Sequence, residues 1–92
     1  MTKTEALLIR LMEECAELQQ ATAKALEFGL TSDNFGALPL TNGEQMNAEL
    51  DDILAIAGML NDAGVVFATN FPNQKRIEEK QKRVTAMLKK LK

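Results

Sequence analysis

Two short segments of this chain place acidic residues where amphipathic helices normally carry apolar ones. The segment "EECAE" holds Glu13, Glu14 and Glu17, and the segment "ELDD" holds Glu49 and Asp52. Each segment contains two acids spaced i, i+3, and residues with this spacing are neighbours on a helix surface. If the two segments pack together, four carboxylates meet.

The first acid of each pair lies within an apolar stripe. Glu14 is seven residues after Leu7 and three after Leu11, and Glu49 is three after Met46 and four before Ile53. These are the spacings of one helix face. Bringing like charges into a partly dry site is costly unless protonation, basic partners or a cation offsets the repulsion.

Mg²⁺ is the cation that suits such a cluster best, because it takes hard oxygen ligands and needs few protein carboxylates when waters and phosphates complete its shell. Mn²⁺ is the possible substitute. A transition-metal site is disfavoured because the chain has no histidine and its one cysteine, Cys15, is poorly placed. One EExxE motif occurs often by chance on a solvated helix, but two acid pairs that both begin on an apolar face are far more specific.

The elements that must position these acids are helical, because helix-forming residues dominate and Tyr and Trp are absent. Apolar periodicity predicts helices at about 4–28, 43–63 and 72–91. Thr4 is the expected cap of the first helix and Gly29 its terminator, while Thr41 or Asn42 caps the second.

The remaining segments are interpreted as connections. Residues 30–42 form a long loop, in which Phe35 is expected to plug the core rather than to stack on a base. The apolar segment 65–71 is expected to be a packed connector, since it has no partner strand. Cys15 is expected to be a small core residue.

The predicted fold is all-α: residues 1–92 form one domain, a three-helix antiparallel protomer that assembles into a four-helix-bundle-type oligomer. A chain of 92 residues is marginal for a single core. The third helix has only a narrow apolar stripe, which favours assembly between chains.

Acidic and basic residues are distributed unevenly along the chain. Residues 1–74 carry 11 acids and 3 bases, a balance of −8, whereas residues 75–92 carry 8 bases and 2 acids, a balance of +6. A basic helix can bind nucleic acid, but no aromatic residues alternate with these bases, so a solvated face that offsets the acidic body is the favoured interpretation.

No apolar run approaches the length of a membrane span, and the first residues lack the apolar region of a signal peptide. We therefore expect a cytoplasmic protein without membrane partners.

The acidic segments resemble a known signature. "EECAE" followed by "ELDD" looks like the EExxE…ExxD motif of the MazG-like all-α nucleoside triphosphate pyrophosphohydrolases. The resemblance extends over the whole chain and is greatest to the short, phage-type, single-domain members; "DDILAIAGMLNDAG" is particularly similar to their second helix.

The resemblance implies an enzyme that cleaves a nucleoside triphosphate, with Mg²⁺, to a nucleoside monophosphate and pyrophosphate. It implies a homodimer or homotetramer whose paired subunits build four-helix bundles. Carried over by position, the metal ligands are Glu14, Glu17, Glu49 and Asp52. Glu13 matches the first glutamate of the motif, and either Glu13 or Glu17 is the candidate general base.

A triphosphate also needs cationic partners. Arg10 and Lys24 lie seven residues before and after Glu17 and therefore on its side of the helix, although they could equally balance local acids. Lys80 and Arg83, three apart on the third helix, are the next candidates for binding phosphate.

Two other functions remain open. Phosphoribosyl-ATP pyrophosphohydrolases share the acidic motif, so only their substrate differs. The alternative of another class is a helical interaction module without enzymatic activity, in which the acids bind partners or an adventitious cation.

Overall fold

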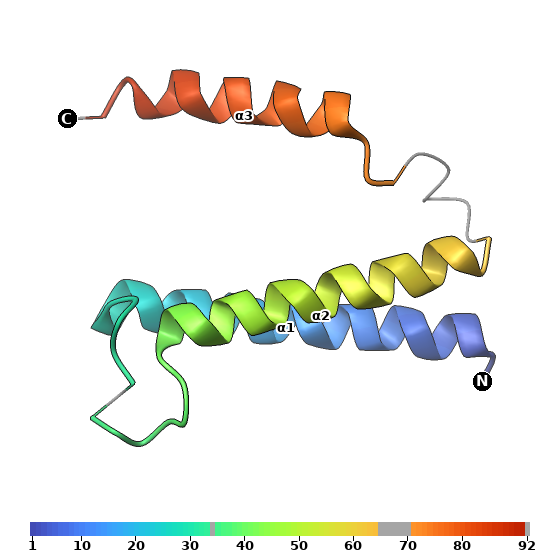
Figure 1. Ribbon diagram of the computed structural model, residues 1–92, viewed down its shortest axis with the longest axis horizontal. Helices are drawn as coiled ribbons and strands as arrows, with labels where there is room; N and C mark the ends of the chain where they lie inside the picture. The colour runs from blue at the N-terminus through green and yellow to red at the C-terminus, as the bar shows by residue number, and fades with distance from the viewer. Residues whose placement is uncertain (34, 65–70, 92) are drawn as a thin grey trace.

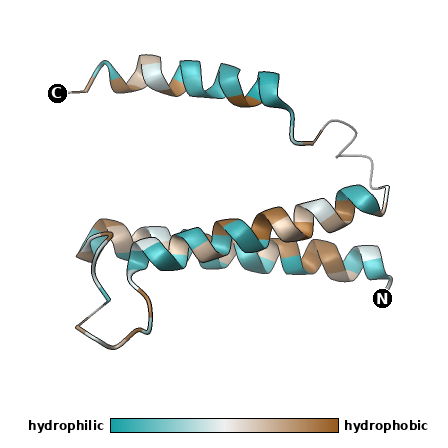
Figure 2. Cartoon of the chain, viewed as in Figure 1, coloured by the Kyte–Doolittle hydropathy of each residue, from teal (hydrophilic) through white to brown (hydrophobic). Residues whose placement is uncertain are grey.

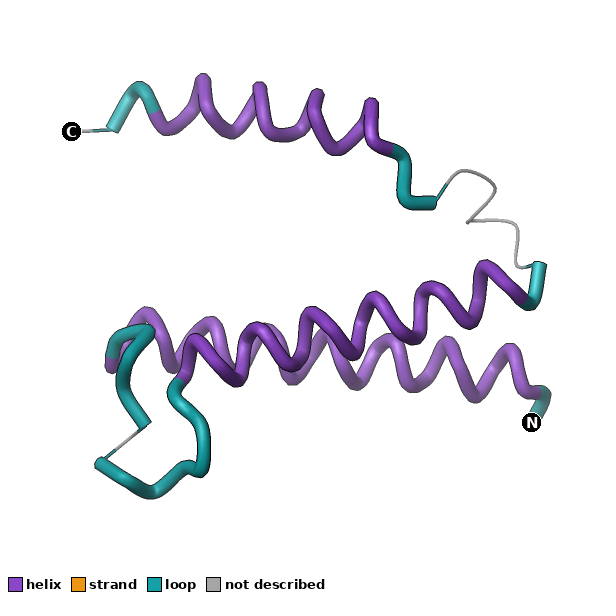
Figure 3. Tube along the Cα trace, in the orientation of Figure 1, coloured by secondary structure: helices purple, strands orange, loops and turns teal. Residues whose placement is uncertain are grey.

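The computed structural model describes residues 1–33, 35–64 and 71–91. They form three helices: α1 spans Lys3–Phe28, α2 spans Asn42–Asp62 and α3 spans Gln74–Leu88. Within these residues there is no strand, and loops make up the rest (Figures 1 and 3). The prediction of an all-α chain is confirmed.

α1 and α2 form an antiparallel hairpin, and α3 stands apart from it. The two hairpin helices lie side by side along most of their length (Figure 1). Among the described residues, α3 contacts neither of them. Within one copy of the chain the structure is therefore a helical hairpin with a separate third helix.

The sequence determines both ends of α1 locally. The Thr2 side chain accepts a hydrogen bond from the Glu5 N–H at 3.0 Å, and the Glu5 carboxylate accepts one from the Thr2 N–H at 3.0 Å. This capping box satisfies two N–H groups that the helix leaves free. The prediction that Thr4 caps the helix is wrong, because Thr4 already lies in the first turn. Gly29 ends α1 with a φ of 100°, as expected of a terminating glycine.

A second capping box begins α2. Thr41, one of the two predicted caps, exchanges hydrogen bonds with Glu44. The next residue, Asn42, is 1% exposed, and its side-chain amide donates to the carbonyl oxygen of Gly29 at 3.0 Å and to that of Lys24 at 3.4 Å. Since helix ends leave carbonyl oxygens without intrahelical partners, Asn42 attaches the start of α2 to the end of α1.

The loop between the hairpin helices is fixed where it rejoins α2. The N–H of Gly43 donates to the Leu30 carbonyl at 2.8 Å. A Cβ at Gly43 would lie 3.1 Å from that oxygen, so the close approach favours glycine. Phe35 does not plug the core, because it is 100% exposed. Its left-handed backbone, with a φ of 62°, belongs to a turn that projects from the hairpin.

The third helix is shorter than predicted. α3 begins after Asn73, whose side chain accepts from the Arg76 N–H at 3.2 Å, and it ends at Leu88. The predicted bounds of 72–91 are therefore too wide, because Asn73, rather than a residue before Pro72, supplies the cap. The predicted packed connector, 65–71, lies outside the described residues except for Phe71.

Each hairpin helix contacts the other through residues that are spaced alternately by three and four. Residues with this spacing form one stripe along a helix, and the contact stripe of each helix is called its seam. Most of these residues are buried or half-buried, and Glu14 and Glu49 occupy the middle of the two seams. In α1 the seam consists of Leu7, Leu11, Glu14, Leu18, Ala21 and Ala25, and in α2 of Asn42, Met46, Glu49, Ile53 and Leu60.

The hairpin therefore has two different faces. Along a helix, each residue points about 100° away from the one before it. Because α1 and α2 run in opposite directions, the residue after a seam position points to the same side of the hairpin in both helices. The side formed by the residues that follow seam positions is named the apolar face, because it carries exposed apolar side chains: Leu8, Met12, Leu50 and Leu54. The residues that precede seam positions form the polar face: Arg10, Glu13, Glu17, Lys24, Gln45 and Asp52.

Cys15 follows Glu14 and thus belongs to the apolar face. It is a free, exposed thiol, so the prediction that it is a core residue is wrong. The seam is narrower than the apolar stripe in the sequence, and Cys15 lies at the edge that the second helix leaves uncovered. Figure 2 shows that hydrophobic residues are frequent in both hairpin helices and sparse in α3.

None of the helices in the described part of the chain combines the length and the hydropathy that a membrane-spanning segment needs.

Candidate metal centre

The hairpin brings three of the predicted ligands together. Glu14 and Glu17 from α1 and Glu49 from α2 each offer one carboxylate oxygen, and these oxygens lie within 4.8 Å of one another. Glu14 is 9% exposed and Glu49 is 5% exposed, whereas Glu17 opens onto the polar face. The cluster therefore runs from the packed seam to the solvent.

Two oxygen atoms in this cluster are buried without a hydrogen-bond donor. Oε2 of Glu14 and Oε2 of Glu49 find no hydrogen-bond partner among the residues that the structure describes. A buried carboxylate oxygen without a partner is costly, and native proteins rarely leave one. Either a proton or a cation must therefore complete this pair.

Glu14 holds a proton more tightly than an ordinary glutamate does. The pKa of Glu14 is raised to about 7, chiefly by a hydrogen bond with the Glu49 carboxyl group, which forms only when a proton lies between them. Desolvation and the negative charges of Glu17, Asp52 and Glu49 raise this pKa further. A carboxyl that is protonated near neutral pH can exchange its proton for a metal ion.

Glu17 shares this environment in a weaker form. Its pKa is raised, first by a hydrogen bond with the Glu49 carboxyl and then by the Glu49 charge. Because Glu17 is exposed on the polar face, it can reach both a bound cation and a solvent molecule.

Gln45 is a site residue that sequence reasoning missed. Its side-chain amide donates to Oε1 of Glu49 at 2.7 Å, which leaves Oε2 of Glu49 for the cluster. Groups that orient a metal-binding carboxylate in this way tune its affinity. The signal was present in the sequence, since Gln45 lies four residues before Glu49 and therefore one helical turn away.

The other two predicted acids lie near the cluster but outside it. Asp52 is close enough for its charge to raise the pKa of Glu14, yet it is not among the three carboxylates within 4.8 Å of one another. Glu13 is paired with Arg10, at 3.2 Å between Nη1 and Oε2, and both side chains are largely exposed.

A pocket adjoins the cluster on the polar face. It measures about 400 Å³ and lies between the second half of α1, the start of α2 and Leu38 of the loop. Two acids of the cluster, Glu17 and Glu49, are among the residues that line it, whereas Glu14 is not. The remaining residues that line it are Gln20, Ala21, Lys24, Leu38, Asn42 and Gln45.

Among the predicted cations, only Lys24 lines this pocket. Arg10 lies on the same face but faces Glu13. Lys80 and Arg83 belong to α3, which contacts neither hairpin helix in the described part of the chain, so one copy does not bring them to the acids.

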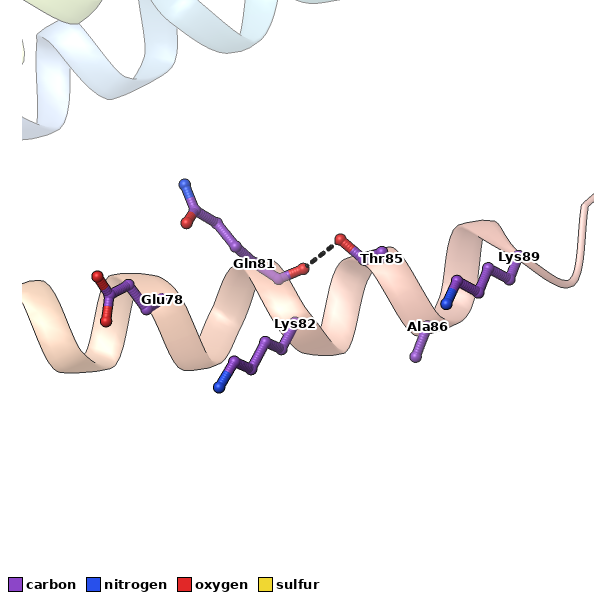
Figure 4. A pocket seen from close by; sticks show the side chains of 6 residues that line it. All are labelled: Glu78, Gln81, Lys82, Thr85, Ala86 and Lys89. Carbon is purple, nitrogen blue, oxygen red and sulfur yellow. Dashed lines mark hydrogen bonds between the residues drawn. The ribbon is translucent and has the colours of Figure 1, made fainter.

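A second concave surface, of about 450 Å³, lies on α3 (Figure 4). Five of its six lining residues come from α3 and the sixth, Lys89, directly follows it; Figure 4 shows Lys82, Ala86 and Lys89 on the same side. The Thr85 hydroxyl donates to the Gln81 carbonyl at 2.7 Å, an ordinary bond within the helix. A surface with walls from a single helix does not enclose a small ligand.

The donor set of the cluster fits a hard divalent cation. Three carboxylates supply oxygen ligands only, Gln45 orients one of them, and the pocket leaves room for water or phosphate oxygens. Mg²⁺ is usually held by one or two carboxylates together with waters and substrate phosphates. The residues present therefore suit Mg²⁺ better than a metal that needs nitrogen or sulfur.

No protein-family model, no curated protein and no solved structure matches the chain.

Proposed function

We propose that this protein is an Mg²⁺-dependent nucleoside triphosphate pyrophosphohydrolase, which adds water across the bond between the α and β phosphates to give a nucleoside monophosphate and pyrophosphate. One observation carries the proposal: the buried Oε2 atoms of Glu14 and Glu49 lack a hydrogen-bond donor, and their carboxylates cluster with that of Glu17 next to a pocket that Glu17 and Glu49 line. Burying two facing carboxylates in a helix seam lowers stability, and a bound cation would offset this cost.

The acids have distinct roles in this proposal. Glu14, Glu17 and Glu49 hold the cation, and Asp52 adds negative charge beside them. Mg²⁺ in this position would neutralise phosphate charge and lower the pKa of a bound water. Of the two predicted general bases, Glu17 is favoured, because it lies exposed in the cluster and lines the pocket, whereas Glu13 is engaged by Arg10.

The pocket accommodates the rest of the substrate. Lys24 offers a cation for phosphate oxygens, and the amide groups of Gln20 and Gln45 are suited to hydrogen bonding with a base or sugar. A volume of about 400 Å³ lies within the usual range for small-molecule sites.

The test is pyrophosphate release from a panel of canonical and modified nucleoside and deoxynucleoside triphosphates, with Mg²⁺ and with EDTA. We expect release that requires Mg²⁺ and that falls by at least ~100-fold in Glu49→Gln, since loss of a metal ligand costs more than loss of a supporting group. The matched control is Asp51→Asn, an exposed acid on the same helix that the proposal does not use.

Two results would contradict the proposal. If the folded protein releases pyrophosphate from no nucleotide of the panel, the reaction is wrong, and phosphoribosyl-ATP becomes the next substrate to test. If Glu49→Gln and Asp51→Asn behave alike, the cluster is not the site of the reaction. Mg²⁺ binding measured by calorimetry without nucleotide distinguishes an interaction module that holds a cation from a chain with no metal site.

The proposal includes assembly into a homodimer or homotetramer. The apolar face of the hairpin exposes Leu8, Met12, Leu50 and Leu54 by 41, 66, 47 and 59%. Two hairpins that pack these faces together would form a four-helix bundle and leave both polar faces, with their acids, open to solvent.

A further inference from the structure

The third helix has no packing partner within its own chain. No residue of α3 is buried, and in the described ranges α3 contacts neither α1 nor α2. One side of α3 and of the residues just after it nevertheless carries a row of apolar residues, of which Val84 is half-buried and the others are exposed; this row is named the α3 stripe: Ile77, Val84, Leu88 and Leu91. Isolated helices of this length are marginal in water, so α3 needs a surface to pack against.

The chain as a whole exposes too much surface for a compact monomer. Its accessible area is 7337 Å², whereas a compact protein of this mass exposes about 5,300 Å². Its radius of gyration is 16.2 Å, against about 12 Å for a compact domain of this length. The excess, about 2,000 Å² per chain, is what a subunit of an obligate dimer buries.

Charge indicates which surface α3 fits. Between residues 75 and 92 the balance is +6, and between residues 1 and 74 it is −8. The basic residues next to the α3 stripe, Arg76, Lys80 and Arg83, recur at spacings of four and three, so they flank the stripe along its length. The hairpin therefore complements α3 in overall charge, and its apolar face complements the α3 stripe.

We propose that α3 is an arm that packs on the hairpin of a second copy of this chain. The α3 stripe joins the apolar faces of the two hairpins in one shared core, and its basic flank lies against the acidic surface of the second hairpin. This inference rests on the assembly proposed above but not on the reaction. It also brings Lys80 and Arg83, which one copy holds away from the acids, to the other copy's hairpin.

Matched substitutions on α3 test the arm. Sedimentation equilibrium over a concentration series measures the dissociation constant of the oligomer for the wild type, Val84→Asp and Lys82→Asp. Val84 lies in the α3 stripe, so a charge there should raise the dissociation constant by at least ~100-fold. Lys82 is two residues before Val84, about 200° around the helix, and therefore lies on the opposite side of α3. Its substitution should change the constant by no more than ~2-fold. Circular dichroism checks that both variants remain helical.

A mixed sample tests whether the contact is between copies. Protein labelled with ¹³C and ¹⁵N is mixed with unlabelled protein, and isotope-filtered NOEs then report contacts between copies alone. NOEs from the Val84 or Leu88 methyl groups of one copy to the Leu8, Leu50 or Leu54 methyl groups of the other support the proposal. The same NOEs found only within one copy overturn it, because α3 would then fold back onto its own hairpin.

The hairpin variant Leu54→Asp separates this inference from the assembly itself. If Leu54→Asp dissociates the oligomer while Val84→Asp does not, the hairpins pair without the arm and the inference is wrong. A wild type that is monomeric at all concentrations removes both the arm and the assembly, and pyrophosphate release would still report on the reaction. Dissociation by both variants, together with intermolecular NOEs, supports the arm.

Discussion

At the scale of single residues, the notable feature is the pair of glutamates that face each other in the seam of the hairpin. A polar residue at such a position lowers stability and can fix the register of paired helices. Here both helices carry one, and the two carboxyl groups meet only when α1 and α2 are aligned as observed. The same alignment places Gln45 beside Glu49, and it brings Glu17 and Glu49 together in the lining of the pocket.

The raised pKa of Glu14 predicts how stability depends on pH. The pKa of Glu14 is about 7 in the folded protein, against an ordinary value of 4.5. The folded state therefore binds this proton more tightly than the unfolded state, and its stabilising contribution is complete below pH 4.5 and lost as pH rises toward 7. Glu14→Gln, which keeps the shape without the charge, should be more stable than the wild type at pH 8 and nearly equal to it at pH 4.5.

Thermal unfolding at these pH values, in EDTA, provides the measurement. Glu27→Gln, an exposed glutamate on the same helix, is the control and should track the wild type throughout. A stability difference between Glu14→Gln and the wild type that does not change with pH would show that the two acids do not share a proton.

Cation binding should show the opposite dependence on pH. Because a metal ion replaces the proton on Glu14, Mg²⁺ affinity should rise as pH increases toward 8.

Removal of the group that orients Glu49, in Gln45→Met, should raise the Mg²⁺ dissociation constant by ~10-fold. Calorimetric titration measures both effects. The exposed Asn47→Met on the same helix is the matched control, and an equal loss in both variants would mean that Gln45 does not orient the site.

At the scale of elements, residues at the start of α2 fix the position of the helix that carries Glu49. Thr41 and Glu44 form its capping box, and Asn42 fastens it to the end of α1 one turn before Gln45. The position of the Glu49 side chain therefore depends on where α2 begins.

Thr41→Ala should lower the free energy of unfolding by about 1 kcal/mol, the usual cost of losing such a cap. Urea denaturation measures the change. Thr31→Ala, an exposed threonine in the preceding loop, should leave this free energy nearly unaltered. If both substitutions cost the same, the capping box contributes nothing beyond a loop threonine.

At the scale of the whole molecule, the described part of one chain buries little apolar surface. Its buried apolar residues are Ala21, Ala57 and Leu60. So small a core seldom sustains a domain. The protein should therefore unfold as an oligomer, and its melting temperature should rise with protein concentration, because folding is then linked to association. A melting temperature that stays constant over a hundredfold dilution would show that the single chain is stable alone.

The sequence by itself determined the helices and the anomaly within them, because both depend on contacts between residues a few positions apart. The periodicity that predicts α1 and α2 also shows that Glu14 and Glu49 lie where apolar residues belong. The start of α1 was also legible in the sequence, since only Thr2 has a glutamate three residues later, which is the spacing of a capping box.

Only the tertiary structure decided which residues meet. Three of the four predicted ligands converge and Asp52 stays beside them, because the exact register of two packed helices sets distances that spacing within one helix cannot give. The exposure of Cys15 and of Phe35 and the separation of α3 from the hairpin follow from the same cause. Burial depends on what packs against a stripe, and that partner is distant in the sequence or belongs to another chain.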